Sequence, residues 1–125
     1  MAGNNYYVAY EAPYSVFSPF LIQLMTEKHL GRNAWAVMAV LAMEVHSDRT
    51  FGLKSAAKIS ELSGLSERAV ARGMDELKAN NLITPVVKKR KDGSKYIDRS
   101  CFGHVATYCF TKDAWERISP GFKQS

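Results

Sequence analysis

The chain has 125 residues, a length that suits one domain with a sizeable core and is short for two. Its hydrophobic share of 46% and charged share of 23% are those of a folded protein and exclude a disordered one. The net charge is +5, and the longest apolar run, residues 34–43, is about half of the ~20 residues that a membrane span requires. Because no basic-then-apolar leader stands at the N-terminus, we expect a cytoplasmic protein.

The first expected elements are an aromatic arm and a helix. Residues 6–10 predict a short strand or extended arm, and Ser18 followed by Pro19 predicts the start of a helix that runs to about His29 and stops at Gly31. Tyrosine and phenylalanine are enriched at interface cores, so we interpret residues 1–32 as a dimerisation element. The alternative is that these side chains only cover the domain that follows. They are Tyr6, Tyr7, Tyr10, Tyr14, Phe17 and Phe20.

Residues 33–125 are expected to form one compact α+β unit that is mainly helical. Asn33 would cap a helix at residues 34–46, which is apolar on nearly every face and is therefore expected at the centre. Asp92-Gly93 predicts a two-residue hairpin turn, in which both central positions need positive φ. The other expected elements are a short strand at 50–53, helices at 55–63 and 66–80, strands at 82–90 and 95–110, and a helix at 112–118 capped by Thr111.

The helices at residues 55–63 and 66–80 form a helix-turn-helix pattern. Gly64 lies where the chain must reverse, a position that favours a left-handed glycine, and Ser66 is placed to cap the second helix. Leu65 is expected to pack the turn against the core. Gly73 predicts close packing of the second helix against the first. At 100° per residue, the side chains expected to face the core are Ile59, Leu62, Val70, Met74 and Leu77.

Two arginines occupy the opposite face of the second helix. Arg68 and Arg72 fall side by side near its N-terminal half, about 160° from the buried stripe on either side. A guanidinium can bond bidentately to guanine O6 and N7, and Ala71 is small enough to approach a thymine methyl group. Glu67 could accept a hydrogen bond from cytosine N4 or orient Arg68. The alternative interpretation is a solvated charged face, which is the norm for exposed helices.

Positive charge clusters around the expected hairpin turn. Between Lys54 and Arg99 there are eleven Lys or Arg residues and six Asp or Glu residues, a net of +5, while the rest of the chain has six of each. This partition is expected of an electrostatic footprint for a polyanion. The alternative is a hairpin whose lysines only solubilise an exposed edge. The candidate phosphate contacts are Lys88, Lys89, Arg90, Lys91 and Lys95 on the hairpin, with Lys54 and Lys58 near the start of the first paired helix.

The segments AWAVMAVLA and SAAKISELSGLSERAVARGMDELKANNLI, with the hairpin after them, resemble winged helix-turn-helix domains. Such domains occur in plasmid and phage replication initiators and in bacterial transcription regulators, and the resemblance covers residue 34 to about residue 110. It implies three core helices and a two- to three-stranded wing sheet, to which this chain adds the N-terminal arm and helix. It also implies that the exposed early positions of the second paired helix face the DNA groove: Ser66, Glu67, Arg68, Ala71 and Arg72.

The function expected from these features is sequence-specific binding of double-stranded DNA by a homodimer. The protein would be a transcription regulator, or a replication or partition factor of a plasmid or phage, associated with the nucleoid or plasmid of a bacterial or archaeal cell. Replication, partition or transcription proteins are the possible further partners. The competing hypothesis is a protein–protein assembly module that uses a winged-helix fold without specific DNA readout.

Catalytic and metal chemistry are not expected. Cys101, His104 and Cys109 offer three zinc ligands rather than four, and a continuous strand would separate them too widely to share a metal. The two cysteines would lie roughly 26 Å apart on such a strand, beyond the ~7 Å Cα separation of a disulfide, so two reduced thiols are expected. The sequence contains no phosphate-cradling glycine loop or nucleophile motif. We therefore predict no enzyme activity, no metal and no cofactor.

Overall fold

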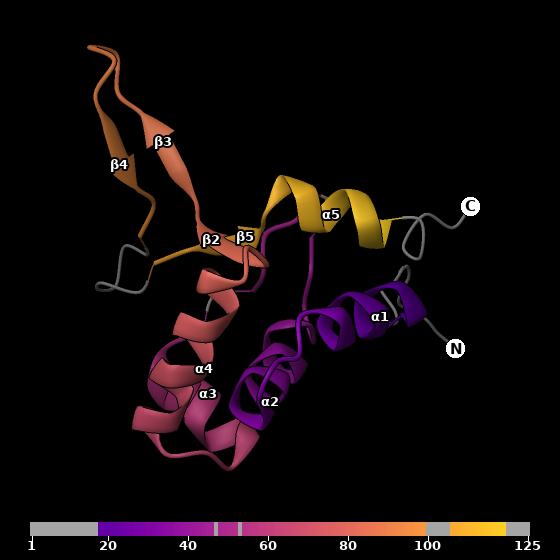
Figure 1. The fold of residues 1–125 in the computed structure, drawn as a ribbon. Coiled ribbons are helices and arrows are strands. Elements are labelled where there is room, and N and C mark those ends of the chain that lie inside the picture. Colours follow the sequence, from indigo (N-terminus) through magenta and orange to yellow (C-terminus); the bar gives the residue numbers. More distant parts are fainter. Residues whose placement is uncertain (1–17, 47, 53, 100–105, 120–125) are drawn as a thin grey trace, which may run out of the picture.

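The computed structural model describes residues 18–46, 48–52, 54–99 and 106–119. In these residues the fold is α+β and mainly helical, with five helices and two small antiparallel sheets (Figure 1). None of the helices in this part of the chain is long and apolar enough to cross a membrane. In chain order the elements are α1 (Pro19–Glu27), α2 (Arg32–Leu41), α3 (Ala56–Ser63), α4 (Glu67–Ala79), β2 (Ile83–Pro85), β3 (Val87–Lys89), β4 (Lys95–Ile97), β5 (Tyr108–Phe110) and α5 (Lys112–Ile118).

Four helices begin at the hydroxyl residues that the sequence placed there. Ser18, Ser55, Ser66 and Thr111 each have extended backbone, and each side-chain oxygen accepts a hydrogen bond from the backbone N–H three residues later. The acceptor distances run from 3.1 Å at α3, α4 and α5 to 3.3 Å at α1. These bonds satisfy N–H groups that have no partner inside the helix. The predicted starts of these four helices are confirmed.

Helix α2 differs from its prediction at both ends. Gly31 is its N-cap rather than the stop of the preceding helix, which ends at Glu27, and Asn33 lies inside the first turn of α2. The helix ends at Leu41 instead of continuing to residue 46. The reason is tertiary: Val45 forms a β-bridge with Phe51, and the Gly52 N–H donates to the Glu44 carbonyl, so this stretch pairs across a loop.

The core surrounds α2, as its apolar sequence predicts. Helices α3 and α4 pack on it, and α1 packs against α5 on the side away from the hairpin (Figure 1). Phe110 of β5 is fully buried, with its ring centroid 4.6 Å from that of Phe51 and 5.8 Å from that of Trp115. Buried residues from α1, α2, α3, α4, β2, β5 and α5 belong to one hydrophobic cluster, so these seven elements share a single core, whereas β3 and β4 are exposed.

Each of the two long predicted strands is divided in two. Strand β2 pairs with β5 in the register Ile83↔Phe110, whereas β3 pairs with β4 in the register Val87↔Ile97. The exchange of partners occurs at Val86, whose N–H donates to the Thr107 carbonyl while its own carbonyl accepts from Asp98. The strand predicted at 95–110 is therefore interrupted, and the cysteine separation computed from a continuous strand does not apply; Cys101 lies outside the described residues.

The hairpin turn is also longer than predicted. The Arg90 N–H donates to the Ser94 carbonyl, and the Gly93 N–H donates to the Arg90 carbonyl, which leaves three residues in the loop. Only Gly93 of the Asp92-Gly93 pair has positive φ, at 91°. This is a three-residue hairpin loop in which glycine occupies the left-handed position, rather than a two-residue turn that needs positive φ twice.

Candidate functional site

The turn between α3 and α4 has the predicted chemistry. Gly64 ends α3 in the left-handed conformation, at φ 79° and ψ 3°. The Ser60 hydroxyl donates to the Leu65 carbonyl, and the Leu65 N–H donates to the Ser63 hydroxyl 3.2 Å away. Leu65 is partly buried against the core. These contacts set the angle between the two helices and hence the direction in which α4 presents its outer face.

The inner face of α4 is buried as predicted, but the helix that it approaches closely at Gly73 is not the one that was expected. Val70 and Leu77 are buried and Met74 is partly buried. A Cβ on Gly73 would lie 2.7 Å from the Asn33 carbonyl oxygen and 2.7 Å from Val37 Cγ2, so the close approach is to α2 and not to α3. The small residue thus lets α4 lie directly on the central helix.

Leu62 does not contribute to the inner face of α3. Its side chain is 43% exposed, whereas Ile59 is buried. Helix α3 has only eight residues, and its last turn lies at the end of the helical bundle farthest from the sheets (Figure 1). The prediction for Leu62 was therefore wrong because the periodicity of one short helix does not reveal where its neighbours end.

The five positions expected to face a DNA groove share one property: all are exposed. Arg68 and Arg72 form no ion pair with any described residue. The two acidic residues that follow the arginines on α4 have other partners, because Asp75 pairs with Lys78 at 3.6 Å and Glu76 accepts from the Gly31 N–H at 2.7 Å. Glu67, which precedes Arg68, forms no ion pair with any described residue. Both guanidinium groups thus keep their donors for a ligand. The five positions are Ser66, Glu67, Arg68, Ala71 and Arg72.

The β3–β4 hairpin carries the second group of exposed cations and projects from the body of the molecule (Figure 1). Lys89 and Lys95 lie directly opposite each other in the ladder. Like charges in this position repel, and a polyanion beside them would relieve the repulsion. Lys88 pairs with Asp98 at 3.7 Å, and the Arg90 guanidinium lies 4.6 Å from the centre of the Tyr96 ring.

One carboxylate lies at the hairpin tip. The Ser94 N–H and hydroxyl donate to Asp92 Oδ1 at 2.9 and 2.7 Å, and these bonds hold the pKa of that carboxyl below its ordinary value. Asp92 is therefore ionised at neutral pH, and its carboxylate stabilises the loop through these two hydrogen bonds. The exposed cations around it are Lys88, Lys89, Arg90, Lys91 and Lys95.

The two cations predicted on the α3 side differ in their surroundings. Lys58 is 52% exposed and pairs with Glu61 at 3.6 Å. The Lys54 side chain is only 12% exposed, and its Nζ lies 3.9 Å from Glu44 Oε1. The structure thus places Lys54 in a pocket, apart from the hairpin cations.

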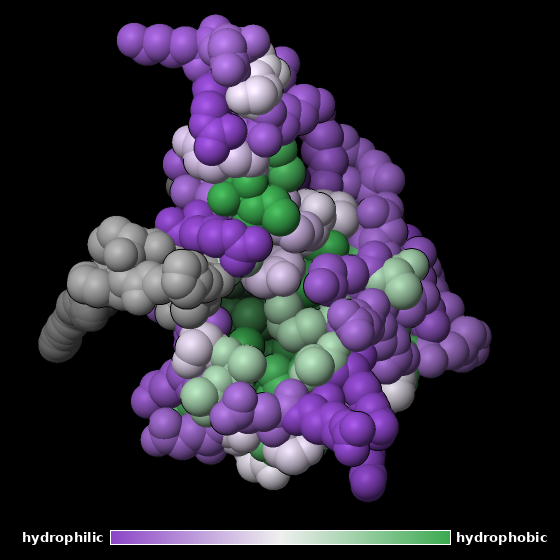
Figure 2. All heavy atoms as spheres, turned by 90° about the vertical axis from the view of Figure 1, so that its left-hand side faces the viewer, coloured by the Kyte–Doolittle hydropathy of each residue, from purple (hydrophilic) through white to green (hydrophobic). Residues whose placement is uncertain are grey.

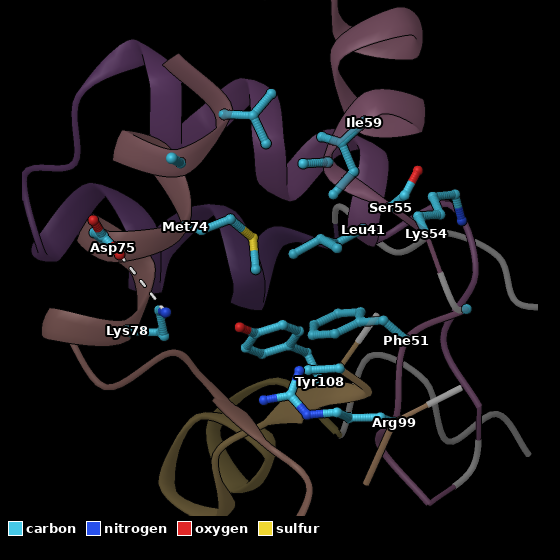
Figure 3. Close-up of a pocket in the computed structure, with 15 residues that line it drawn as sticks. Leu41, Phe51, Lys54, Ser55, Ile59, Met74, Asp75, Lys78, Arg99 and Tyr108 are labelled. Carbon is cyan, nitrogen blue, oxygen red and sulfur yellow. Dashed lines mark ion pairs between the residues drawn. The ribbon is translucent and has the colours of Figure 1, made fainter. Parts of the chain in front are cut away.

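That pocket was missed by the sequence analysis. It lies between α3, α4 and the strands, has a volume of about 380 Å³, and appears in Figure 2 as a hollow with hydrophobic surface between the hairpin and the helices. Phe51, Met74, Arg99 and Tyr108 line it (Figure 3). Because these residues come from separate segments, no local pattern in the sequence indicates that they meet.

The remaining predicted residues lie mostly outside the described part of the chain. These are Tyr6, Tyr7, Tyr10, Tyr14 and Phe17 of the expected dimer interface, together with Cys101 and His104. Phe20 is described, and its side chain is 43% exposed on α1. Cys109 is a buried free thiol, and burial raises its pKa. Within the described ranges no three His, Cys, Asp or Glu side chains form a metal-binding group.

Comparison with known proteins identifies no relative: no protein-family model matches this chain, and no curated protein matches its sequence. The described residues carry two exposed cationic features. One is the outer face of α4, and the other is the β3–β4 hairpin that follows it in the chain.

Proposed function

We propose that this chain is a winged helix-turn-helix protein that binds double-stranded DNA in a sequence-specific manner. The order of its elements supports this proposal. Helix α2 leads to Thr50, a residue that forms an isolated β-bridge, then to α3, α4 and the hairpin strands. Thr50 bridges Cys109 of β5, and β5 pairs in turn with β2. A three-helix core followed by such a sheet and a protruding hairpin is the arrangement that the sequence resemblance implies.

The observation that carries the proposal is the outer face of α4. Its early residues are exposed, and its two arginines have no carboxylate partner among the described residues. The major groove admits an α-helix, and arginine bound bidentately to guanine is the commonest specific contact there. Arg68 and Arg72 are therefore the proposed base-reading residues, and Ser66, Glu67 and Ala71 are secondary contacts.

The hairpin supplies the proposed contacts with the DNA backbone. Its exposed cations would neutralise phosphates beside the groove that α4 enters, which adds affinity without sequence preference. Lys89, Lys91 and Lys95 are the strongest candidates, because no described carboxylate forms an ion pair with them. Lys88 already pairs with Asp98, and Arg90 already lies over the Tyr96 ring, so a phosphate would compete with these partners.

We further propose that the protein acts as a homodimer, with the aromatic N-terminal segment at the interface. Two copies would place two recognition helices on half-sites about one helical turn apart, roughly 34–36 Å. Such a dimer would serve as a transcription regulator, or as a replication or partition factor of a plasmid or phage. The arrangement of its sites distinguishes these roles, since inverted repeats in promoters favour regulation and direct repeats beside an origin favour replication or partition.

The proposal is tested by selecting bound fragments from a library of random duplexes with the full chain. We expect enrichment of a short motif, and a binding constant for that motif at least a thousandfold stronger than for scrambled duplex. No detectable binding to any duplex at micromolar protein in low salt would overturn it.

A protein–protein assembly module is the second candidate, and exposed apolar side chains favour it. Val87 and Ile97 lie opposite each other on the hairpin and are 55% and 39% exposed, and Leu62 is exposed on α3. Two results together would support this candidate over the first: the unaltered chain binds no duplex, and the Val87→Ser variant no longer binds a protein partner that the unaltered chain binds.

A further inference from the structure

The pocket beneath the hairpin has the size and lining of a ligand site. Its volume of about 380 Å³ falls within the ~300–1,000 Å³ typical of small-molecule pockets. The Phe51 and Tyr108 rings form one wall, and Met74 of α4 and Leu41 of α2 extend toward them from the helices (Figure 3). A flat apolar group would therefore contact aromatic rings on one side and aliphatic side chains on the other.

The polar groups around this apolar lining are mainly cationic. Lys54, Lys78 and Arg99 line the pocket, and Asp75 is the only carboxylate among its described lining residues, a net of +2. Glu44 lies outside this lining but pairs with Lys54 at 3.9 Å, which lowers the local net charge to +1. Asp75 is already paired with Lys78, whose Nζ also lies 5.7 Å from the centre of the Tyr108 ring. The local charge thus disfavours a cationic ligand and favours an anionic one.

One end of the pocket is especially suited to an anion. Lys54, Ser55 and Ala56 line it there, and Ser55 is the N-cap of α3. The first N–H groups of a helix have no partner within it and carry partial positive charge. The Lys54 side chain is only 12% exposed, and its Nζ lies 3.9 Å from Oε1 of Glu44, whose own side chain is 56% exposed. A ligand carboxylate would therefore compete with Glu44 for a largely desolvated ammonium group beside this helix end.

We propose that this pocket binds a small aromatic carboxylic acid. The ring lies between Met74 and the aromatic pair Phe51 and Tyr108, and the carboxylate lies at Lys54 and the N-terminus of α3. The apolar body supplies burial, and the charge-assisted hydrogen bonds at Lys54 select an acid over its neutral analogue.

The pocket is also lined by residues from the exposed side of α4. Ala71 and Asp75, one turn apart on that helix, line the pocket, and Ala71 belongs to the proposed base-reading group. A bound acid would therefore change the affinity for duplex DNA, a consequence that rests on the proposed function. Binding of the acid itself does not rest on it, because no DNA is needed to measure it.

The test uses two probes of nearly equal shape, indole-3-acetate and indole-3-acetamide. Each is titrated into the ¹⁵N-labelled full chain, and the amide signals of Ala71, Lys78 and Tyr108 are followed by NMR. We expect saturable shifts at these residues with the acid, and binding of the amide about tenfold weaker. No saturable shifts up to millimolar probe, shifts confined to other residues, or equal affinity for both probes would overturn the proposal.

Variants separate the carboxylate site from general effects. Lys54→Met should bring the two dissociation constants within about twofold, whereas Lys58→Met, one turn away on α3 and outside the pocket, should retain the tenfold preference. Ala71→Leu narrows the pocket from an exposed position and should weaken both probes without unfolding the chain. A Lys54→Met protein that keeps the full preference would remove the carboxylate from this end of the pocket.

The DNA consequence is measured separately, by titrating duplex with and without saturating indole-3-acetate. A changed duplex affinity supports the link to α4, and an unchanged one removes that link. Failure to bind duplex at all would refute the proposed function, while the NMR titration would still decide whether the acid binds.

Discussion

The carboxylate of Glu76 in α4 accepts a hydrogen bond from the backbone N–H of Gly31, with 2.7 Å between Oε2 and N. Gly31 is the N-cap of α2 and has no side chain with which to cap it. The carboxylate of another helix therefore lies at the positive end of the α2 dipole, where a negative charge is favourable. Together with the close contact at Gly73, this bond fixes how α4 lies on the central helix.

Removing this contact should lower stability without affecting the exposed arginines. We expect Glu76→Ala to reduce the free energy of unfolding by about 1 kcal/mol, the usual size of a capping interaction. Glu76→Gln keeps an acceptor but loses the charge, so its loss should be smaller. Urea unfolding measures both, with Glu116→Ala, an exposed glutamate on α5, as the control. An unchanged unfolding midpoint in Glu76→Ala would show that the bond adds nothing.

Gly73→Ala tests the close approach of α4 to α2. Alanine is the better helix former by about 1 kcal/mol, so on an exposed helix the change would stabilise. Here the new Cβ would meet the Asn33 carbonyl oxygen and Val37 Cγ2 at 2.7 Å, and we expect a net loss of about 1–3 kcal/mol from overpacking. Differential scanning calorimetry of the single and double variants with Val37→Ala checks this, because the smaller residue should relieve part of the strain. A more stable Gly73→Ala protein would contradict the packing.

The parts of the fold that the sequence predicts well are those set by local chemistry. Ser18, Ser55, Ser66 and Thr111 cap helices because a hydroxyl before an apolar periodic segment satisfies nearby N–H groups whatever else surrounds it. The left-handed Gly64 follows from the same kind of local requirement.

What the sequence does not predict depends on contacts between distant segments. The early end of α2 follows from the bridge between Val45 and Phe51, and the division of the strands follows from the partner exchange at Val86. Periodicity shows that Gly73 lies beside a buried stripe but cannot show that α2 lies opposite it. The exposed face of α4 was predictable because a helical period determines which residues share a face.

Arg72→Ala should distinguish base readout from general attraction. On the preferred duplex we expect a loss of ~1–3 kcal/mol in binding free energy, and a much smaller loss on scrambled duplex. Arg72→Lys keeps the charge but cannot form the planar bidentate pair, so it should retain affinity for scrambled duplex while losing preference. Fluorescence anisotropy titrations give both constants. Equal losses on the two duplexes would remove Arg72 from base readout.

Lys89→Ala should weaken binding to all duplexes alike. If Lys89 neutralises one phosphate, the slope of log K against log salt should become less steep by about 0.9, the value for one contact on B-DNA. Lys112→Ala is the matched control, because it removes one exposed lysine from α5, on the side of the molecule away from the hairpin (Figure 1). A salt slope in Lys89→Ala identical to that of Lys112→Ala would mean that the hairpin does not contact the backbone.

Burial of Cys109 predicts a loss of stability at alkaline pH. Desolvation raises the pKa of its thiol, an effect that the nearby Arg49 guanidinium opposes only in part. Below the ordinary thiol pKa, near 9, the thiol keeps its proton in both the folded and the unfolded chain, and its contribution to the free energy of unfolding is fully present. As the pH rises further, the unfolded chain loses its proton first, so the free energy of unfolding falls until the folded pKa is reached. Cys109→Ala should lower stability at neutral pH through lost packing but show a flatter decline above pH 9. Urea unfolding of both proteins under reducing conditions, from pH 7 to pH 10.5, isolates the thiol, since the other titrating groups are common to the two chains. Parallel curves over that range would show that the buried thiol does not contribute to the alkaline loss.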